Sequence, residues 1–465
     1  MEITEILKQP FDKALAELTK DPQEKDAKID DYRKAFTGQH AILDDTTRRD
    51  VQITNSDGTN RTVKHTKETI PYQKRIVNSA VTFLFGEPLK LILNDEEADN
   101  SKAFDRINEV WKQNKLDYFN KALARDLFVE CKVAELWHVP KKEEGKDARI
   151  RVVLLSTRAG YKIYPHYDDE GDMDAFTLRF DTKDDKGKTI ANATIFTATN
   201  ITDAFKKEGG EWKDTKRENL AGKIPIVYYE QDEPEWKCVE TQINRAEYLV
   251  SNFADTVDYN GSPILQIKGT VNNLPQKEET GKVVTVALEY DDNGKASCPG
   301  GVEYVTWDQA PEAIRLEYDI LKDTIYGMTS TPDLSFQNVK GMQAVSGIAL
   351  RLMFSDALFK ALDKQETFGP AMERRLSIMK AMIGVTDNSL KAQLDNLDID
   401  IKFGDVLPQN IQELIESLTL ARGGEPIMSE ESAVKHNPLV TDADEDIKAL
   451  KGEKAALKSF GESYE

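Results

Sequence analysis

The sequence predicts an α+β protein in which antiparallel hairpins come first and long helices follow, with a small β-rich insert between two of those helices. Three patterns in the 465 residues indicate this class. Alternating runs of β-branched and aromatic residues fill residues 133–229, which is typical of hairpin strands. Apolar residues then recur every three or four positions in 239–257 and in 314–325. A further helical pattern occupies residues 345–383.

The first 130 residues predict helices and one hairpin. The hairpin is "VQIT", a turn at Asp57-Gly58, and "TNRTVK". A helix is expected over 70–85, with Gly86 as a left-handed cap and Pro88 preventing continuation. The strand "LKLIL" and two helices, 99–114 and 116–129, are expected next.

The region 133–229 predicts six strands: "VAELWHV", "RIRVVLLS", "YKIYPHY", "AFTLRFD", "TIANATIFTA" and "IPIVYYE". Gly, Asp and Lys fill the connections, which suits tight turns. One connection, "DDKGKT", has the composition of a phosphate-binding loop. Such a loop needs a glycine five positions before Gly187, where this chain has Thr182. A surface hairpin turn is therefore the better interpretation.

Two helices are predicted to bracket the small insert. In the first, the apolar positions are spaced four, three, four, three and four, a stripe that packs a neighbouring helix at a shallow angle. In the second, Pro311 lies in the first turn, where a missing N–H costs little. Between them, "ILQIKGTV", "KVVTVALEY" and "VEYVTW" predict strands. The stripe residues are Val239, Ile243, Ala246, Val250, Phe253 and Val257 in the first helix, and Ile314, Tyr318, Leu321 and Ile325 in the second.

The chain then predicts an elbow and a long helix. Residues 327–341, "GMTSTPDLSFQNVKG", contain two glycines, a proline and small polar residues, so no regular element is expected there. The long helix carries Leu352, Phe359 and Leu362 on one face, and a break with a kink is expected at Gly369-Pro370. The strand "LDIDIKF" and short helices complete the C-terminal part.

Composition limits the functions that the chain can have. Its formal net charge is −20, so the chain as a whole repels DNA, which weakens a repressor or polymerase interpretation. It does not exclude a protein that lets DNA pass without holding it. No apolar stretch reaches the roughly 18 residues of a membrane span. The five histidines and three cysteines lack metal-ligand or disulfide spacing, and no cofactor is indicated.

Four segments, in order, carry a family resemblance. They are "IPYQKRIVNSAVTFLFGEPLKL"; "GKIPIVYYEQDEPEWKCVETQINRAEYLVSNFADTVDYNGSPILQIKG"; "MTSTPDLS" with "GMQAVSGIALRLMF"; and the region from "IKFGDVLPQN" to "KALKGE". Together they span about residues 70–453 and resemble phage portal proteins of the SPP1-like family. The Gly369-Pro370 step and the short C-terminal part, which implies a small crown, depart from the family pattern.

The resemblance implies a portal fold with a wing, a two-helix stem, a β-rich clip, a kinked tunnel helix and a small helical crown. The corresponding ranges are 1–235 for the wing, 236–262 for the first stem helix, 263–306 for the clip, 307–329 for the second stem helix, 330–343 for the tunnel loop, 344–397 for the long kinked helix and wing return, and 398–465 for the crown and C-terminal tail.

The resemblance also implies function and partners. The expected assembly is a homo-oligomeric ring of twelve subunits at one capsid vertex of the virion, assembled in the host cytoplasm, through which double-stranded DNA passes without sequence specificity. Expected partners are the large terminase packaging ATPase, the head-tail adaptor, and the major capsid or scaffolding protein. The implied site residues are Phe336, Gln337, Asn338 and Lys340 in the tunnel loop; Val239, Ile243, Val250, Phe253, Ile314, Leu321 and Ile325 in stem packing; and Ile264, Gln266, Lys268, Val284 and Val286 in the clip.

Two alternatives remain open at this stage. Converging acidic side chains could bind divalent metal in a phosphoryl-transfer enzyme, although the sequence identifies no such set. The chain could instead be a structural head protein without a tunnel, which the symmetry of its oligomer would distinguish.

Overall fold

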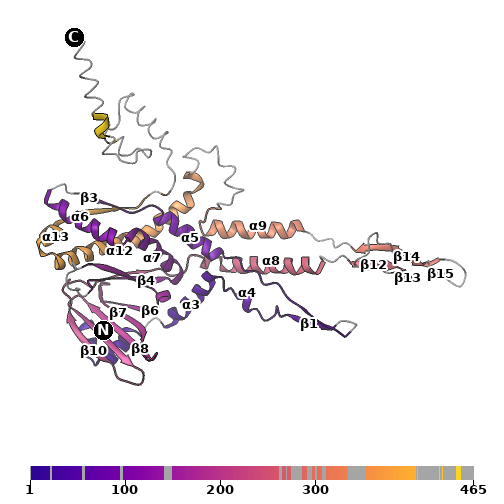
Figure 1. Cartoon of the computed structure of the whole chain (residues 1–465), viewed down its shortest axis with the longest axis horizontal. Coiled ribbons are helices and arrows are strands. Elements are labelled where there is room, and N and C mark those ends of the chain that lie inside the picture. The colour runs from indigo at the N-terminus through magenta and orange to yellow at the C-terminus, as the bar shows by residue number, and fades with distance from the viewer. Residues whose placement is uncertain are drawn as a thin grey trace, which may run out of the picture. The chain divides into compact units, whose positions relative to one another are not determined.

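The structure is a computed structural model that describes residues 2–20, 23–54, 58–94, 98–140, 149–260, 264–268, 270–273, 285–287, 289–290, 296–298, 301–305, 311–333, 351–404, 406, 429, 432 and 447–451. The chain divides into two compact units, the first comprising Met1–Gly341 and Phe354–Val406, and the second Met342–Met353 and Leu407–Glu465. The helices and strands labelled in Figure 1 belong to the first unit.

The prediction of a mixed helix-and-sheet protein is confirmed. The N-terminal elements include the expected hairpin, β1–β2, and the expected helix, α5. Their bounds are α1 Ile3–Ile6, α2 Phe11–Leu18, α3 Gln23–Thr37, α4 Ala41–Asp44, β1 Val51–Thr54, β2 Asn60–Val63, α5 Tyr72–Phe85, β3 Lys90–Leu93, α6 Ala98–Gln113 and α7 Leu116–Glu130.

Two antiparallel sheets form the β region. One has five strands in the order β10-β9-β8-β7-β6, and the other has three in the order β11-β4-β5. All six predicted strands are present, and two more, β9 and β10, were not predicted. The bounds are β4 Lys132–His138, β5 Arg151–Leu155, β6 Tyr161–Tyr167, β7 Met173–Lys183, β8 Thr189–Thr197, β9 Asn200–Lys207, β10 Lys213–Glu218 and β11 Ile226–Glu230.

The segment "DDKGKT" is the β7–β8 hairpin turn, as its composition indicated. Asp184 accepts hydrogen bonds from the backbone N–H groups of Lys186 and Lys188, both at 2.9 Å, and Gly187 has φ of +78°. A glycine is favoured there because side-chain-bearing residues rarely adopt positive φ.

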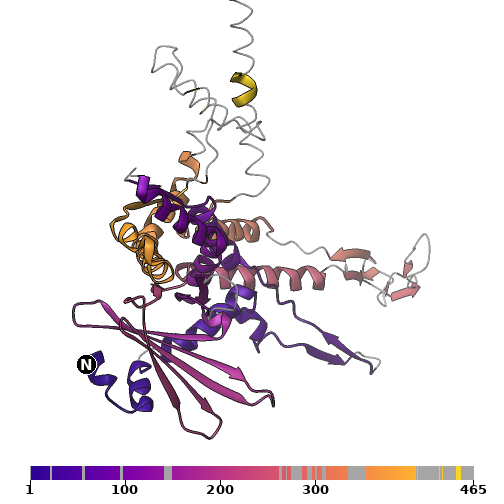
Figure 2. The same ribbon diagram turned by 60° about the vertical axis from the view of Figure 1, so that its left-hand side comes forward.

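Helices cover the three-stranded sheet and form the main core. Helix α12, Ser355–Thr386, packs against α5, β11 and β4 (Figure 2). Its Phe368 is fully buried, with ring centroids 5.0 Å from Phe85, 5.3 Å from Tyr229 and 6.2 Å from Phe128. After α12 come a 3₁₀ turn, Asn388–Leu390, then α13 Lys391–Asn396 and β18 Ile399–Lys402, which pairs with β3.

A fully buried ion pair joins α12 to the sheet. Arg375 Nε lies 2.9 Å from Glu135 Oε2, and Arg375 Nη2 donates to Glu135 Oε1. Asn120 Oδ1 accepts from Arg375 Nη1 at 2.7 Å, and the Tyr229 hydroxyl donates to Glu135 at 2.5 Å. Burial and the Glu135 charge raise the pKa of Tyr229 well above its usual value, so this hydroxyl stays a donor.

Gly86 differs from its predicted role. It ends α5 with φ of −58° and ψ of −43°, which is right-handed helical geometry and not the left-handed cap. A Cβ at this position would lie 2.9 Å from a methyl group of Val406 and 2.4 Å from the Thr82 carbonyl oxygen. Glycine is therefore required for close approach of the chain.

The break predicted at Gly369-Pro370 is wrong, whereas the kink expected there stays a prediction. Helix α12 is continuous from Ser355 to Thr386 with Pro370 inside it. Phe368 and Met372 on either side are fully buried, and this packing holds the backbone helical across the missing N–H. The helical conformation is instead lost at Phe354, just before α12, where φ is −103° and ψ is 9°.

Replacing Arg375 with methionine should destabilise the protein strongly, because Glu135 would remain buried without its partner. We expect a loss of about 3–5 kcal/mol in the free energy of unfolding. Urea unfolding followed by tryptophan fluorescence measures it. The matched control is Arg245→Met, which breaks an ion pair whose arginine and glutamate are 53% and 42% exposed and should cost at most about 1 kcal/mol. Equal losses in the two variants would contradict the role given to the buried pair.

A second buried carboxyl should make stability depend on pH. Burial and the nearby charge of Asp126 raise the pKa of Glu130 to about 7, although its Oε2 accepts from the Thr157 N–H at 2.7 Å. The folded protein therefore keeps a proton that the unfolded chain releases, and the stabilisation is lost as pH rises through about 7.

We expect Glu130→Gln to flatten the fall in urea midpoint between pH 5 and pH 8, because the amide cannot titrate. Glu109→Gln, at a 51% exposed side chain, is the control and should keep the wild-type slope. If Glu130→Gln also keeps that slope, Glu130 is not the group responsible.

Candidate functional site

Two long helices, α8 Glu240–Asn260 and α9 Pro311–Met328, lie side by side (Figures 1 and 2). A short 3₁₀ turn, Lys237–Val239, leads into α8. Arg245 of α8 lies 2.7 Å from Glu317 of α9, and the hydroxyl of Tyr318 on α9 lies 3.2 Å from that of Tyr72 on α5. The first contact joins α8 to α9 at the surface, and the second joins α9 to α5.

The predicted stripe on α8 divides into two parts. Val239, Ile243 and Ala246 are fully buried in the chain's own core, so they are not available to a neighbouring subunit. Val250 is half-buried, and beyond it Phe253 and Val257 are 38% and 45% exposed. The first half of the stripe therefore packs within its own chain, and the second half has exposed apolar side chains.

The predicted stripe on α9 faces inward. Ile325 is fully buried, and Tyr318 and Leu321 pack against the same core. Ile314 is half-buried. This stripe therefore holds α9 to its own chain.

A second apolar face on α9 was not predicted from the sequence. Leu316 and Ile320 are 62% and 56% exposed; Met328 at the end of the helix is 70% exposed but lies on a different side of it. Leu316 and Ile320 lie four residues apart, and both are displaced from the inward stripe, which a helical wheel would have shown. We call this the outer face of α9 and include in it Glu312, Asp319 and Asp323, which the same wheel places beside Leu316.

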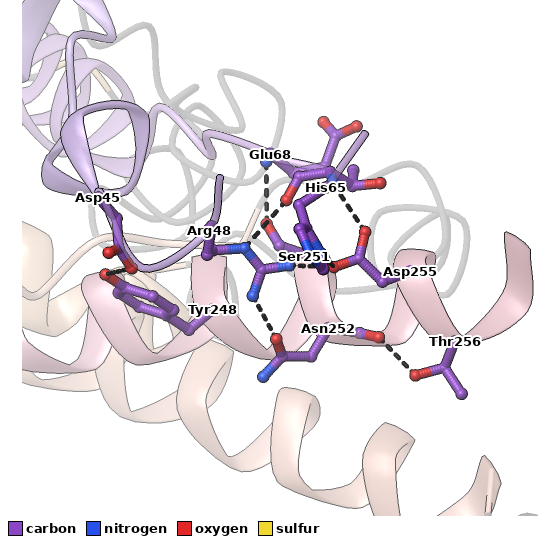
Figure 3. A network of polar contacts seen from close by, with 10 residues as sticks. Asp45, Arg48, His65, Glu68, Tyr248, Ser251, Asn252, Asp255 and Thr256 are labelled. Atoms are coloured by element: carbon purple, nitrogen blue, oxygen red, sulfur yellow. Dashed lines mark hydrogen bonds and ion pairs between the residues drawn. The ribbon is translucent and has the colours of Figure 1, made fainter. Parts of the chain in front are cut away.

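A polar strap runs along the other flank of α8 (Figure 3). We define the strap as residues 40–70, which contain α4 and the β1–β2 hairpin. At its N-terminal end, buried His40 bonds through Nδ1 to buried Glu247 of α8. At its C-terminal end, the N–H of Ile70 donates to the same carboxylate at 2.8 Å, and that of Glu68 to Ser251 Oγ at 2.9 Å.

The root of the hairpin is fixed by Asp255. Arg48, just before β1, donates to Asp255 and to Asn252. After β2, the Thr66 N–H donates to Asp255 at 2.7 Å, and His65 Nδ1 lies 3.1 Å from it. Both ends of the hairpin therefore meet one carboxylate. Although partial burial opposes it, these donors hold the pKa of Asp255 below its usual value.

Two further titrating groups reinforce the strap. Hydrogen bonds from Thr47 and Tyr248 lower the pKa of Asp45 to about 2, so Asp45 is an acceptor at any ordinary pH. Burial of His40 favours the neutral ring, but the hydrogen bond to Glu247 and its charge outweigh burial and raise the pKa of His40. The His40–Glu247 contact is therefore strongest below the raised pKa of that imidazole.

The end of α9 is anchored to α12 by a second ionic cluster. Glu235, almost fully buried, lies 2.7 Å from Lys360 Nζ and 2.5 Å from Lys364 Nζ. Lys360 also donates to the Thr329 carbonyl at 3.0 Å. Burial alone would raise the pKa of Glu235, but the two lysines lower it. Ser330, which follows Thr329 at the end of α9, has φ of +50°, an uncommon value for a side-chain-bearing residue.

The remaining expected site residues are placed only in part. Phe336, Gln337, Asn338 and Lys340 of the expected tunnel loop, and Val284 of the expected clip, lie outside the described residues. Ile264, Gln266 and Lys268 belong to β12, which pairs with β17 of the same chain, and Val286 belongs to β14, which pairs with β13. The bounds are β12 Ile264–Lys268, β13 Thr270–Asn273, β14 Thr285–Ala287, β15 Glu289–Tyr290, β16 Ala296–Cys298 and β17 Gly301–Val305.

The described residues contain neither a cluster of metal-binding side chains nor a membrane-spanning helix. Within them, no three His, Cys, Asp or Glu side chains gather as a metal site would need. In the same residues, no helix combines the length and apolar character needed to span a bilayer.

The paired helices thus combine exposed apolar residues on α9 with a hairpin that is anchored to α8, and exposed apolar groups of this kind are typical of proteins that contact other macromolecules. The sequence pattern of phage portal proteins of the SPP1 Gp6-like type matches residues 17–459. The chain belongs to this family, whose members are structural proteins of the capsid.

The chain is also similar to individual proteins and solved structures. It is 22% identical over 428 residues to the portal protein of Bacillus phage SPP1, an alignment that covers 86% of this chain and 78% of that protein. It is similar to a chain in the neck of an empty GTA particle, at 10% identity, TM-score 0.41, and coverage of 78% and 89%. A chain in the virion of a native gene transfer agent (GTA) particle matches at 10% identity, TM-score 0.35, and coverage of 78% and 87%.

Replacing Arg48 with methionine should loosen the strap, because Asp255 would lose its charged donor. We expect the opening free energy of the backbone amides in residues 60–66 to fall by about 1.5–3 kcal/mol, the usual contribution of a hydrogen bond to a charged group. Hydrogen exchange read by mass spectrometry measures this change. Lys186→Met, at an exposed residue of the β7–β8 turn, is the control and should leave exchange in residues 60–66 unchanged. Identical exchange in the two variants would show that Arg48 does not hold the hairpin root.

Proposed function

We propose that this portal protein forms a closed ring of twelve subunits at one vertex of the capsid, and that double-stranded DNA enters and leaves through the channel of the ring. Family membership supports a portal role at the capsid. The observation that most supports a ring is the exposed apolar surface of the paired helices. This surface consists of Leu316 and Ile320 on α9 and Phe253 and Val257 on α8. Exposed apolar side chains grouped on one element are typical of protein–protein contact sites.

The portal regions follow the element order. We assign residues 1–235 to the wing, α8 and α9 to the stem, the short strands β12–β17 to the clip, and α12 to the long tunnel helix. Residues 330–343 are the proposed tunnel loop, and residues 398–465 the crown and tail. In this assignment the Glu235–Lys360–Lys364 cluster joins the stem to the tunnel helix where the loop begins.

The charge of the chain suits a conduit. With a net charge of −20, a ring of this protein would repel phosphates over most of its surface, so DNA could slide without sticking. In the proposed mechanism the ring has no reaction of its own. The packaging ATPase docks on the clip and supplies the work, the head-tail adaptor later takes that position, and the major capsid or scaffolding protein surrounds the ring.

Imaging the purified protein by negative-stain electron microscopy tests the proposal. A closed ring with a central channel is the expected result. A particle that stays a single chain at every protein concentration, or an oligomer without a channel, would overturn it.

Lys340 tests the proposed tunnel loop. In this proposal it contacts DNA phosphates together with Gln337 and Asn338, while Phe336 lies beside them, so Lys340→Glu should place a repelling charge in the channel. We expect the packaged genome to be shorter or packaging to fail, measured as DNA length per particle. Lys186→Glu in the β7–β8 turn is the control and should package a full genome. Normal packaging by the Lys340 variant would remove this residue from the mechanism.

A further inference from the structure

Helix α8 has different neighbours on its two flanks. On one flank it packs against α9, with Arg245 bonded to Glu317. On the other flank it carries the strap, through Tyr248, Ser251 and Asp255 (Figure 3). Both ribbon views show α8 between α9 and the β1 hairpin (Figures 1 and 2). Helix α9 and the hairpin therefore lie on opposite sides of α8 (Figures 1 and 2).

The hairpin carries Val51, which is 48% exposed, so its own chain leaves this residue partly uncovered. Its register pairs Val51 with Val63 and Ile53 with Arg61, and cross-strand partners lie on the same face of a hairpin. Three apolar positions and one arginine position therefore share one face. A two-stranded hairpin is at best marginally stable in water without a packing partner.

The charges of the two surfaces are opposite. Residues 48–67 contain five Lys and Arg against two Asp, a formal charge of +3 in a chain of −20. Within this segment Arg49 and Lys64 are exposed. Helix α9 contains four acidic residues against two basic ones. The side chains of Asp319 and Asp323 on its outer face are 48% and 77% exposed, and their contacts with Arg315 at 3.8 Å and Lys322 at 4.0 Å on the same helix are long.

We propose that the β1–β2 hairpin of one copy packs on the outer face of α9 of the next copy in the ring. Val51 and its neighbours would cover Leu316 and Ile320, while Arg49 and Lys64 approach Asp319 and Asp323. This inference rests on the proposed ring. Because the two surfaces lie on opposite flanks of α8, each copy offers the hairpin to one neighbour and α9 to the other. That is a heterologous contact, the kind that closes into a ring when the rotation between copies allows it.

The fastening of the strap fits this role. An arm that docks on another molecule binds more tightly when its position is fixed beforehand, since less freedom is lost on binding. Asp255 holds both ends of the hairpin, and Glu247 holds both ends of the longer strap. These polar contacts therefore direct the β1–β2 hairpin away from its own chain.

A charge swap in the full-length protein tests the proposal. The hairpin variant is Arg49→Glu with Lys64→Glu, and the helix variant is Asp319→Lys with Asp323→Lys. Each should raise the protein concentration at which half of the chains are in rings by about tenfold, because each places like charges opposite each other. The four substitutions together should restore ring formation. Native mass spectrometry measures the fraction of chains in rings, and thermal unfolding confirms that each variant is folded.

Lys186→Glu with Lys188→Glu is the matched control, since it makes the same charge change in the β7–β8 turn and should leave ring formation unchanged. If wild-type protein forms no ring under any condition, the proposed function itself fails. If wild type forms rings and either variant forms them equally well, or the combined variant is not restored, this contact is wrong while the ring stands. If the hairpin instead binds DNA or the packaging ATPase, the variants should form rings as well as wild type does.

Discussion

The ion pair between Arg375 and Glu135 constrains the rest of this structure. Both side chains are completely buried, and a charge in such a place is tolerated only when it is paired and hydrogen-bonded. The pair joins a helix and a strand that are 240 residues apart in sequence. Arg375 also donates to Asn120, and Glu135 accepts from the Tyr229 hydroxyl. Because all of these contacts have to form together, α12 has little freedom to slide or rotate on the sheet.

Fixing α12 also fixes the base of the paired helices. About three to four turns before Arg375, Lys364 and Lys360 on the same helix reach Glu235, which lies just before α8. Lys360 also holds the carbonyl of Thr329 at the end of α9. The far flank of α8 is held by the strap. The paired helices are thus tied by charged groups at one end and along one side, while the outer face of α9 stays uncovered. This division separates surfaces that stabilise the chain from surfaces available for assembly.

The sequence predicted elements better than it predicted what they contact. Helices α5, α7, α8 and α9 and six strands follow from their apolar spacing. Strand β10 was missed because all six of its residues are exposed, so it has no alternating pattern. The α8 stripe was found, but spacing shows only that a face is apolar, and Val239 and Phe253 have different surroundings although they belong to one stripe. The break predicted at Pro370 was wrong because burial of Phe368 and Met372 outweighs the tendency of proline to end a helix. The strap could not be predicted, since its partners are about 200 residues apart and recognise each other through polar groups without periodicity.

The negative charge of the whole chain limits the kinds of surface through which two copies can associate. Copies of a chain with a net charge of −20 repel one another at long range, and salt weakens this repulsion beyond about 8–10 Å. Association therefore has to come from contacts that act at short range, which are apolar burial and locally opposite charge. The outer face of α9 has exposed leucine and isoleucine, and residues 48–67, which contain the β1–β2 hairpin, have a local excess of positive charge in an acidic chain. In the proposed ring, the same negative charge that would let DNA slide through the channel favours contact between neighbouring subunits through small, chemically distinct surfaces, and the two proposed here belong to elements on opposite sides of α8.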